Sequence, residues 1–308
     1  NLIAPGGGSS GILGVTSFDM AAVDNGEHLI SQNISEVGVF TFTADPPNYL
    51  GLGDVISTST SANIGIFTPD RFSIIDNTPS FDDGCAPGNF TYISQEFGFA
   101  TDPLLTVTAV NTGGVTTNNY GGSFWKLPGL LINRSYNNGA ATASTLTRST
   151  DGGNVTPGDT ANYDGDGILT IVGDRFTYSK PYVPESPFGA LINLDITAAD
   201  LTDNDGICYD PDSDNICDGY QINNIAGTDL HWGRLNIQSN FGPETENLSL
   251  PLTVQYYDGS DFTTHIADDC SQVGLSFNNY TDNLNAGDTC VQDNGNPGNS
   301  GEGCVAAG

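Results

Sequence analysis

Short segments in which apolar and polar residues alternate recur along this chain, and they constrain its fold more than any other feature. In residues 36–44, for example, the valines fall on one face of an extended segment and the phenylalanines on the other. Eight further short segments are also predicted to be strands, at residues 71–75, 89–93, 104–110, 167–172, 175–178, 190–197, 234–237 and 250–257. Turn-forming Asn-Gly and Asp-Gly pairs separate many of them, and no stretch keeps a helical spacing of apolar residues for three turns. The chain is therefore predicted to be all-β.

At 308 residues, the chain is long enough for more than one β-sandwich. Prolines and loop residues cluster near Pro69 and Pro184, which favours domain boundaries there. We expect tandem immunoglobulin-like sandwiches. Residues 1–68 are expected to form a partial sandwich that ends a preceding unit, 69–183 a central sandwich, 184–269 a second sandwich with an acidic loop, and 270–308 a cysteine-containing segment that starts a further unit or forms a tail.

The formal net charge is −30, because 37 acidic residues face only seven basic ones. Such a surface repels nucleic acid and anionic lipid, so neither is expected as a partner. No apolar run approaches the about 20 residues that a membrane helix needs, and direct membrane insertion is not expected. The same charge suits divalent cations and a salty medium.

Residues 201–220 concentrate acidic side chains in one short loop. From Asp210 onward, acidic residues alternate in the way that supplies positions 1, 3, 5 and 9 of a calcium-binding loop, with the carbonyl of Ile216 at position 7. No Glu stands at position 12, which excludes an EF-hand. We predict a structural Ca²⁺ site, the alternative being a solvated acidic loop. The candidate ligands are Asp203, Asp205, Asp210, Asp212, Asp214, Ile216 and Asp218.

The six cysteines form an even set, which favours export and oxidation. Cys208 and Cys217 bracket half of the acidic loop, and we predict a disulfide between them. The other four allow three pairings. Of these, Cys270–Cys290 is favoured, leaving Cys85 with Cys304. Because the chain starts at Asn1 without a signal peptide, we also expect it to be a mature or excised segment of an exported precursor.

No residues in the sequence mark an enzyme site, and no enzyme activity is expected. The acidic turn at Asp164 and Asp166 is interpreted as a hairpin turn rather than a second metal site. Four aromatic residues could stack on a sugar, although packing within the fold is the expected role of aromatic residues on strands. They are Trp125, Trp232, Tyr256 and Tyr257.

Collinear blocks of sequence resemble a known family. They lie at residues 35–44, 49–51, 64–72, 90–92, 97–98, 117–124, 175–178, 187–188, 233–237, 250–259 and 268–271. Over nearly its whole length the chain is similar to the β-rich domain of unknown function of MSHA-pilus (mannose-sensitive haemagglutinin type IV pilus) biogenesis protein Q-like proteins. It departs from their usual pattern at Trp232, where they have Tyr, and at Ile66, where they have Arg. The acidic loop is not tied to that family.

The resemblance implies a secreted component of a pilus system on the surface of a marine Gram-negative bacterium, without an established enzyme activity. The first hypothesis is thus a non-enzymatic, pilus-associated or adhesive segment braced by calcium and disulfides. Its partners would be other pilus or surface-fibre subunits, with surface glycans as a further possibility. The second is a subunit that polymerises into a fibre by β-strand exchange. The third, ranked well behind, is a carbohydrate-active enzyme or a carbohydrate-binding module.

Overall fold

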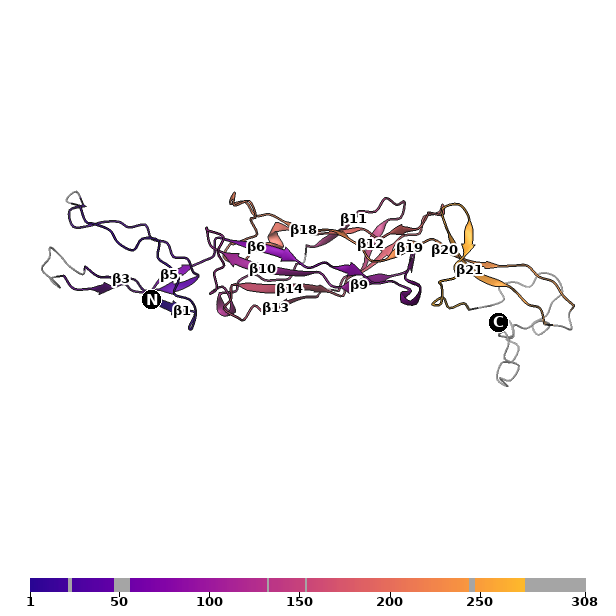
Figure 1. The fold of residues 1–308 in the computed structure, drawn as a ribbon, viewed down its shortest axis with the longest axis horizontal. Coiled ribbons are helices and arrows are strands. Elements are labelled where there is room, and N and C mark those ends of the chain that lie inside the picture. Colours follow the sequence, from indigo (N-terminus) through magenta and orange to yellow (C-terminus); the bar gives the residue numbers. More distant parts are fainter. Residues whose placement is uncertain (22–23, 47–55, 132, 153, 244–246, 275–308) are drawn as a thin grey trace, which may run out of the picture.

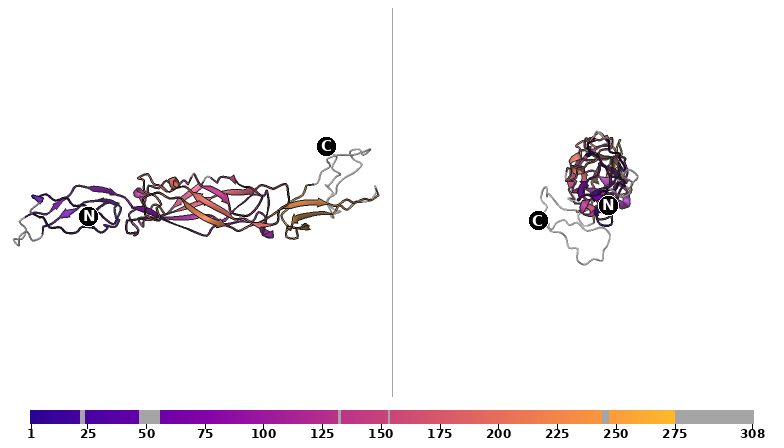
Figure 2. Two further views of the ribbon diagram at one scale, coloured as in Figure 1. Left: turned by 90° about the horizontal axis from the view of Figure 1, so that it is seen from above. Right: turned by 90° about the vertical axis from the view of Figure 1, so that its left-hand side faces the viewer.

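The computed structural model describes residues 1–21, 24–46, 56–131, 133–152, 154–243 and 247–274. These residues form an elongated molecule with three parts placed end to end (Figure 1). We call them the N-terminal unit (residues 1–67), the central body (68–231) and the C-terminal unit (232–274). Figure 2 shows the same succession from above, and its end-on view shows the narrow cross-section. Within the described residues there is no α-helix, and no helix is long and apolar enough to cross a membrane.

The described residues of the N-terminal unit form two small antiparallel sheets. One has the order β1 (Leu2–Ala4), β2 (Gly38–Phe40), β5 (Ile64–Phe67), and the other pairs β3 (Thr43–Ala44) with β4 (Ser59–Thr60). Gly38 has a φ of +142° and a Cβ there would lie 2.4 Å from the carbonyl oxygen of Ala4. Only glycine therefore allows β1 to approach β2 this closely.

Four sheets make up the central body. The first has the order β13 (Asn154–Gly158), β14 (Asp166–Val172), β10 (Leu104–Val110), β6 (Arg71–Asp76). The second has β12 (Leu146–Thr150), β15 (Arg175–Tyr178), β9 (Phe97–Thr101), β7 (Ser80–Phe81). The third has β11 (Ser135–Asn138), β17 (Ile192–Ile196), β18 (Tyr220–Ile225), and the fourth β16 (Phe188–Gly189), β19 (Asp229–His231), β8 (Thr91–Tyr92). Three short 3₁₀ turns lie between strands: η3 (Ala86–Gly88), η4 (Gly122–Phe124) and η5 (Ala198–Leu201).

One continuous hydrophobic core runs through the central body. In β10 the buried residues Leu105, Val107 and Ala109 alternate with partly exposed ones, which is the period-2 pattern of a strand with one buried face. β14 and β17 bury alternate residues in the same way, and a single cluster joins these side chains to residues as far along the chain as Leu230. The all-β prediction is confirmed, and immunoglobulin-like topology stays a prediction.

The boundary predicted near Pro184 does not separate the strands. β11 lies before that position and pairs with β17 after it, from Ser135 with Asp195 to Asn138 with Ile192. Ile192 and Leu194 also belong to the same core as Leu105. Residues 69–183 therefore lack strands that complete their own core, and the central body continues to β19. Residues 275–308, most of the predicted C-terminal segment, lie outside the described residues.

In its described residues the C-terminal unit has one antiparallel sheet, with the order β20 (Gly233–Ile237), β21 (Leu252–Tyr257), β22 (Phe262–Thr264).

At the opposite end of the central body, Asn119 binds the N-terminal unit. Its side-chain amide donates to the carbonyls of Ser9 and Val37 at 2.8 Å and accepts from the Ser9 amide at 2.7 Å. Asn119 therefore ties two segments of the N-terminal unit to the central body.

Candidate functional site

The acidic loop lies between β17 and β18 and packs beside the start of β6. Phe72 donates its backbone N–H to the carbonyl of Cys208 at 2.7 Å, and Phe72 forms a parallel bridge with Tyr209. The disulfide between Cys208 and Cys217 closes the loop, with 5.6 Å between the two Cα atoms. This predicted pairing is confirmed, and it limits the conformations that the loop can adopt.

Asp210 organises the turn inside the disulfide. Its Oδ1 accepts the backbone N–H groups of Ser213 (2.7 Å) and Asp214 (3.2 Å), and its Oδ2 accepts that of Asn215 (3.0 Å). Ser213 and Asn215 adopt left-handed backbone conformations, with φ of 63° and 68°, which aim these amides at one carboxylate. Burial alone would raise the pKa of Asp210, but the three amide donors outweigh burial and hold its pKa below the ordinary value.

Three of the predicted ligands come together. Carboxylate oxygens of Asp210, Asp212 and Asp218 all lie within 4.8 Å of one another, which is compatible with shared coordination of a hard cation. Desolvation, followed by the negative charge of Asp214, raises the pKa of Asp212. A divalent cation would relieve that repulsion. These three carboxylates are the part of the predicted set that fits a Ca²⁺ site.

The remaining predicted ligands do not join this cluster. Asp203 is buried and accepts the Tyr120 hydroxyl at 2.7 Å and the Ile207 amide at 2.8 Å, so its carboxylate anchors the loop to the central body. Asp205 donates its backbone N–H to Asp203. The Oδ1 of Asp214 accepts the N–H of Ile216 at 2.8 Å, and the Ile216 side chain is exposed. The arrangement is therefore a capped acidic turn with three convergent carboxylates.

A second group of three carboxylates lies at the hairpin before β14. Oxygens of Asp159, Asp164 and Asp166 also lie within 4.8 Å of one another. Burial and the charges of Asp164 and then Asp159 raise the pKa of Asp166. The sequence pattern predicts only a turn at residues 164–166 and does not include Asp159, because that residue approaches only through the pairing of β13 with β14.

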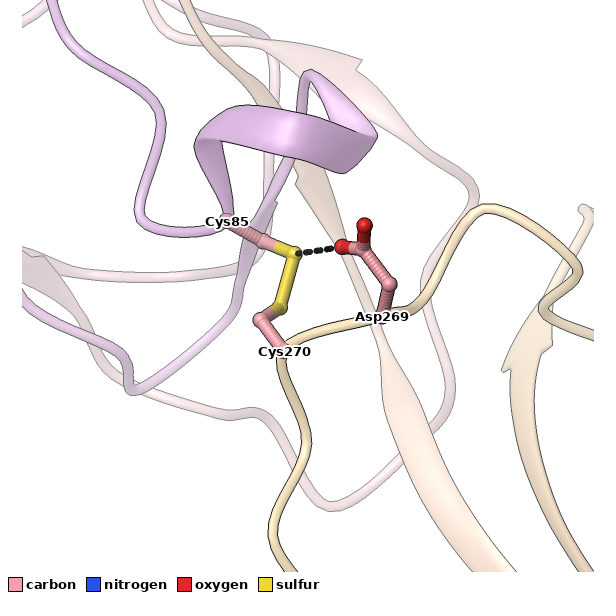
Figure 3. Close-up of side chains that lie close together, drawn as sticks. All are labelled: Cys85, Asp269 and Cys270. Carbon is pink, nitrogen blue, oxygen red and sulfur yellow. Dashed lines mark hydrogen bonds between the residues drawn. A yellow bond between two sulfur atoms is a disulfide. The ribbon is translucent and has the colours of Figure 1, made fainter.

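The second disulfide differs from the predicted pairing. Cys85 is bonded to Cys270, 185 positions further along the chain, with a Cα–Cα distance of 5.9 Å, so the predicted Cys270–Cys290 and Cys85–Cys304 bonds are wrong. Cys290 and Cys304 themselves lie outside the described residues. Figure 3 shows Asp269 beside this bond, with Oδ1 3.8 Å from the Cys85 sulfur. A disulfide sulfur carries no hydrogen to donate and is not available as a thiolate ligand, so this group is a cross-link rather than a metal site.

The cross-link lies in a packed interface between the central body and the C-terminal unit. His231 and His265 approach through Nδ1 and Nε2 at 2.7 Å, and the ring of Phe90 stacks on that of His231 with centroids 5.2 Å apart. The Tyr92 hydroxyl donates to Asp268 Oδ2 at 2.8 Å. Burial lowers the pKa of both histidines, so both are held neutral near pH 7.

The four aromatic residues considered for sugar stacking take part in packing, which is the role expected of them. Trp125 lies against Tyr120, with ring centroids 5.3 Å apart, and its indole N–H donates to the Leu127 carbonyl at 2.9 Å. Trp232 donates to the carbonyl of Pro181 at 3.2 Å, and the Lys180 ammonium lies 3.7 Å from its ring centroid. Tyr256 stacks on His231, and Tyr257 packs on Phe262. These contacts use the aromatic surfaces to hold the parts of the molecule together.

Sequence reasoning missed this junction. The histidines stand far apart in sequence, although His231 and His265 meet because β20 to β22 fold back on the end of the central body. An available signal was the placement of a lone cysteine, Cys270, a few residues after His265. The position of Cys270 alone does not identify its partner, because the contact with Cys85 forms only when segments far apart in the chain come together.

Two family models match the chain. The model described as DUF6701, third domain, matches residues 36–224, and the model described as DUF6701, fourth domain, matches residues 231–307. No curated protein and no solved structure matches the chain. The predicted resemblance to a β-rich domain of unknown function is confirmed at this level, while the relation to MSHA-pilus proteins rests on the resemblance alone. Because the third-domain model covers more than half of its residues, the chain belongs to the DUF6701 family.

Proposed function

We propose that this chain is a non-enzymatic stalk segment of an extracellular bacterial surface protein, one that holds a pilus-associated or adhesive end away from the cell. The observation that carries the proposal is the end-to-end succession of β-units with a disulfide across the interface between the two matched family domains (Figure 1). A stalk needs length and resistance to bending, and both come from packed, cross-linked junctions. Disulfides are also typical of proteins in oxidising, extracytoplasmic compartments.

Both junctions support a stiff connection. At the N-terminal junction, Glu36 accepts the backbone N–H groups of Asn118 and Asn119 at 3.2 and 3.1 Å, and burial raises its pKa. At the C-terminal junction the Lys180 ammonium donates to the carbonyl of Gly233 in addition to its contact with Trp232. Directed hydrogen bonds of this kind fix the orientation of neighbouring units better than apolar contact alone.

The surroundings proposed for the stalk follow from the family resemblance. They are the surface of a Gram-negative, marine bacterium, with other pilus or surface-fibre subunits as partners. The net charge of −30 supports a medium with salt and divalent cations, where the self-repulsion is screened. Calcium in the acidic loop is part of this proposal and depends on Asp210, Asp212 and Asp218.

Calcium binding is tested by thermal unfolding with Ca²⁺ and with a chelator. Because a ligand that binds only the native state stabilises it by mass action, Ca²⁺ should raise the midpoint of the wild type. Asp212→Asn/Asp218→Asn should abolish the rise. Asp205→Asn is the matched control, since it removes a nearby charge outside the cluster, and it should keep the rise. An equal response in all three proteins would rule out this loop as the site.

The stalk function is tested on cells by replacing residues 36–307 with an unrelated rod-shaped segment of the same length. Surface attachment should fall when these residues are deleted and return with the replacement, because a stalk contributes length rather than a specific surface. Recovery only with the native residues would show that they bind a partner themselves, and would refute the stalk.

Strand exchange between copies is the second candidate, and one observation favours it. β1 and β5 are both edge strands of the N-terminal unit, and exposed apolar side chains lie on them at Ile3 and Ile66. Such edges can accept a strand from another chain. Light scattering after size-exclusion chromatography distinguishes the candidates, since only strand exchange predicts a mass that grows with concentration.

A further inference from the structure

The path of the chain toward the Cys85–Cys270 disulfide suggests how this molecule carries tension. The chain enters the central body after β5 and passes along it as residues 71–84, which we call the strap. The strap contains β6 and β7, and Figure 1 shows β6 lying lengthwise in the central body. It ends at Cys85, which is bonded to Cys270 at the C-terminal unit. A covalent route therefore crosses the central body in a single short pass.

The strap is fastened to the central body along its length. β6 pairs with β10 in continuous antiparallel register from Arg71 with Val110 to Asp76 with Leu105. Beyond β6, Asn77 donates its N–H to Leu104 O at 3.1 Å, and Phe81 donates to Ala226 O at 2.8 Å. Phe72 and Phe81 are buried in the core. Pulling along this strand loads its hydrogen bonds together in shear, so they share the force.

Everything between the two cysteines is a closed loop. Residues 86–269 leave the strap at Cys85 and return to the same covalent junction at Cys270, whose Cα lies 5.9 Å from that of Cys85. This loop contains η3, all the strands from β8 to β22, and the acidic loop with its own disulfide. Tension applied at the two ends of the chain passes through the sulfur–sulfur bond and does not pull on the ends of the loop.

We propose that the Cys85–Cys270 disulfide is a mechanical bypass, which confines end-to-end load in the central body to the strap and shields residues 86–269 from extension. Its use on the cell rests on the proposed stalk function. The physical property does not, because it follows from the chain path and the cross-link alone. The bypass prevents residues 86–269 from being extended, even when the load pulls the strap away from β10.

Single-molecule stretching of the full chain, held at its first and last residues, tests the bypass. With the bond intact, only residues 1–84 and 271–308 can be extended, so the final length should fall short of the full chain by roughly 60–65 nm, the contour length of 185 residues. Cys85→Ser/Cys270→Ser should recover that length except for the roughly 3 nm that the Cys208–Cys217 bond still closes off. The matched control, Cys208→Ser/Cys217→Ser, removes a bond inside the loop and should remain as short as the wild type.

Two results would overturn the bypass: a wild type that extends to its full contour length under oxidising conditions, or peptide mapping that places Cys270 in a bond with Cys290 or Cys304. If the double variant does not fold, the wild type stretched before and after reduction on the same tether provides the same comparison. Failure of the spacer replacement on cells would refute the stalk and leave the bypass standing. Full extension of the wild type would refute the bypass and leave the stalk function standing.

Discussion

Asp174 shows how the central body accommodates charge in its interior. Its side chain is 0% exposed, and it accepts hydrogen bonds from Nε and Nη2 of Arg134, both at 2.9 Å, and from the Tyr136 hydroxyl at 2.5 Å. Burial would raise the pKa of Asp174, but these donors and the Gly152 amide outweigh burial and lower it. The buried Asp174–Arg134 ion pair is stable because hydrogen-bond donors surround both oxygen atoms of the carboxylate.

Replacing Asp174 with Asn should destabilise the protein strongly, by about 3–5 kcal/mol, because it removes the only buried counter-charge among the partners described for the Arg134 guanidinium and leaves the half-exposed Asp151. Urea unfolding followed by circular dichroism measures the loss. Asp151→Asn is the control: Asp151 contacts the same guanidinium at 2.7 Å, but its side chain is 54% exposed, so the loss should be below about 1 kcal/mol. Equal losses would contradict the role assigned to burial.

The histidine pair at the C-terminal junction predicts a pH dependence. The pKa values of His231 and His265 are lowered, so the unfolded chain binds protons before the folded one does. The stability that the pair contributes is complete above the ordinary histidine pKa of 6.5, and it is lost as the pH falls from there through the folded pKa values. Asp229 and Asp268 oppose the lowering, and the rings of Tyr92 and Tyr256 pack against the pair.

The measurement is the unfolding free energy of wild type and His265→Gln at pH 7.5 and pH 5. The wild type should lose more stability on acidification than the variant does, since the variant keeps every carboxylate and lacks one buried titrating ring. His28→Gln, which changes an exposed histidine in the N-terminal unit, is the control for the loss of a histidine outside the junction. Identical pH profiles for wild type and His265→Gln would show that the pair does not respond to pH.

Among the elements, sequence predicts best those strands whose burial alternates strictly. The predicted ends of β10, β14 and β17 lie within two residues of the observed ones, because each strand turns one face to the core. β18 was missed because its buried residues, Ile222 and Ile225, are three positions apart. Asn224 between them has a φ of 56°, and the pairing with β17 shifts register there. A local irregularity of this kind leaves no alternation in the sequence to read.

Asn224 is therefore expected to tolerate Gly and to resist a β-branched residue. Asn224→Val should cost about 1–3 kcal/mol, because a branched side chain in the left-handed region is strained. Asn223→Val is the matched control at the neighbouring exposed position, where φ is negative, and it should have little effect. Thermal unfolding compares Asn224→Gly, Asn224→Val and Asn223→Val. A larger loss for Asn223→Val than for Asn224→Val would contradict the assigned irregularity.

The acidic loop shows how far a sequence pattern reaches into a site. The alternation from Asp210 to Asp218 correctly indicated one compact turn, closed by the adjacent cysteines. It could not show that Asp203 accepts a hydrogen bond from the hydroxyl of Tyr120, which is 83 positions away. Nor could it show that the Asp214 side chain lies outside the carboxylate cluster and accepts the Ile216 amide, because an alternating pattern does not fix where each side chain points.

At the scale of the whole molecule, sequence indicates the fold class but not the borders of its parts. Prolines near residue 184 mark a real loop, and Tyr182 and Val183 in it are fully and largely exposed. A loop of this kind looks the same whether it joins two domains or crosses the surface of one. Long-range pairing decides between these cases, and it is the same long-range pairing that places Cys85 beside Cys270.

Cutting this loop tests whether the central body is one folding unit. A specific protease site inserted between Tyr182 and Val183 should be cleaved readily, because the loop is exposed. In reductant, which opens the Cys85–Cys270 bond, the two fragments should still elute together from a sizing column and should separate only in urea. Their association follows from the shared core, since β11 of the first fragment pairs with β17 of the second. Two fragments that separate in native buffer would restore the tandem-sandwich boundary at residue 184, whereas persistent association makes the body from β6 to β19 one cooperative unit.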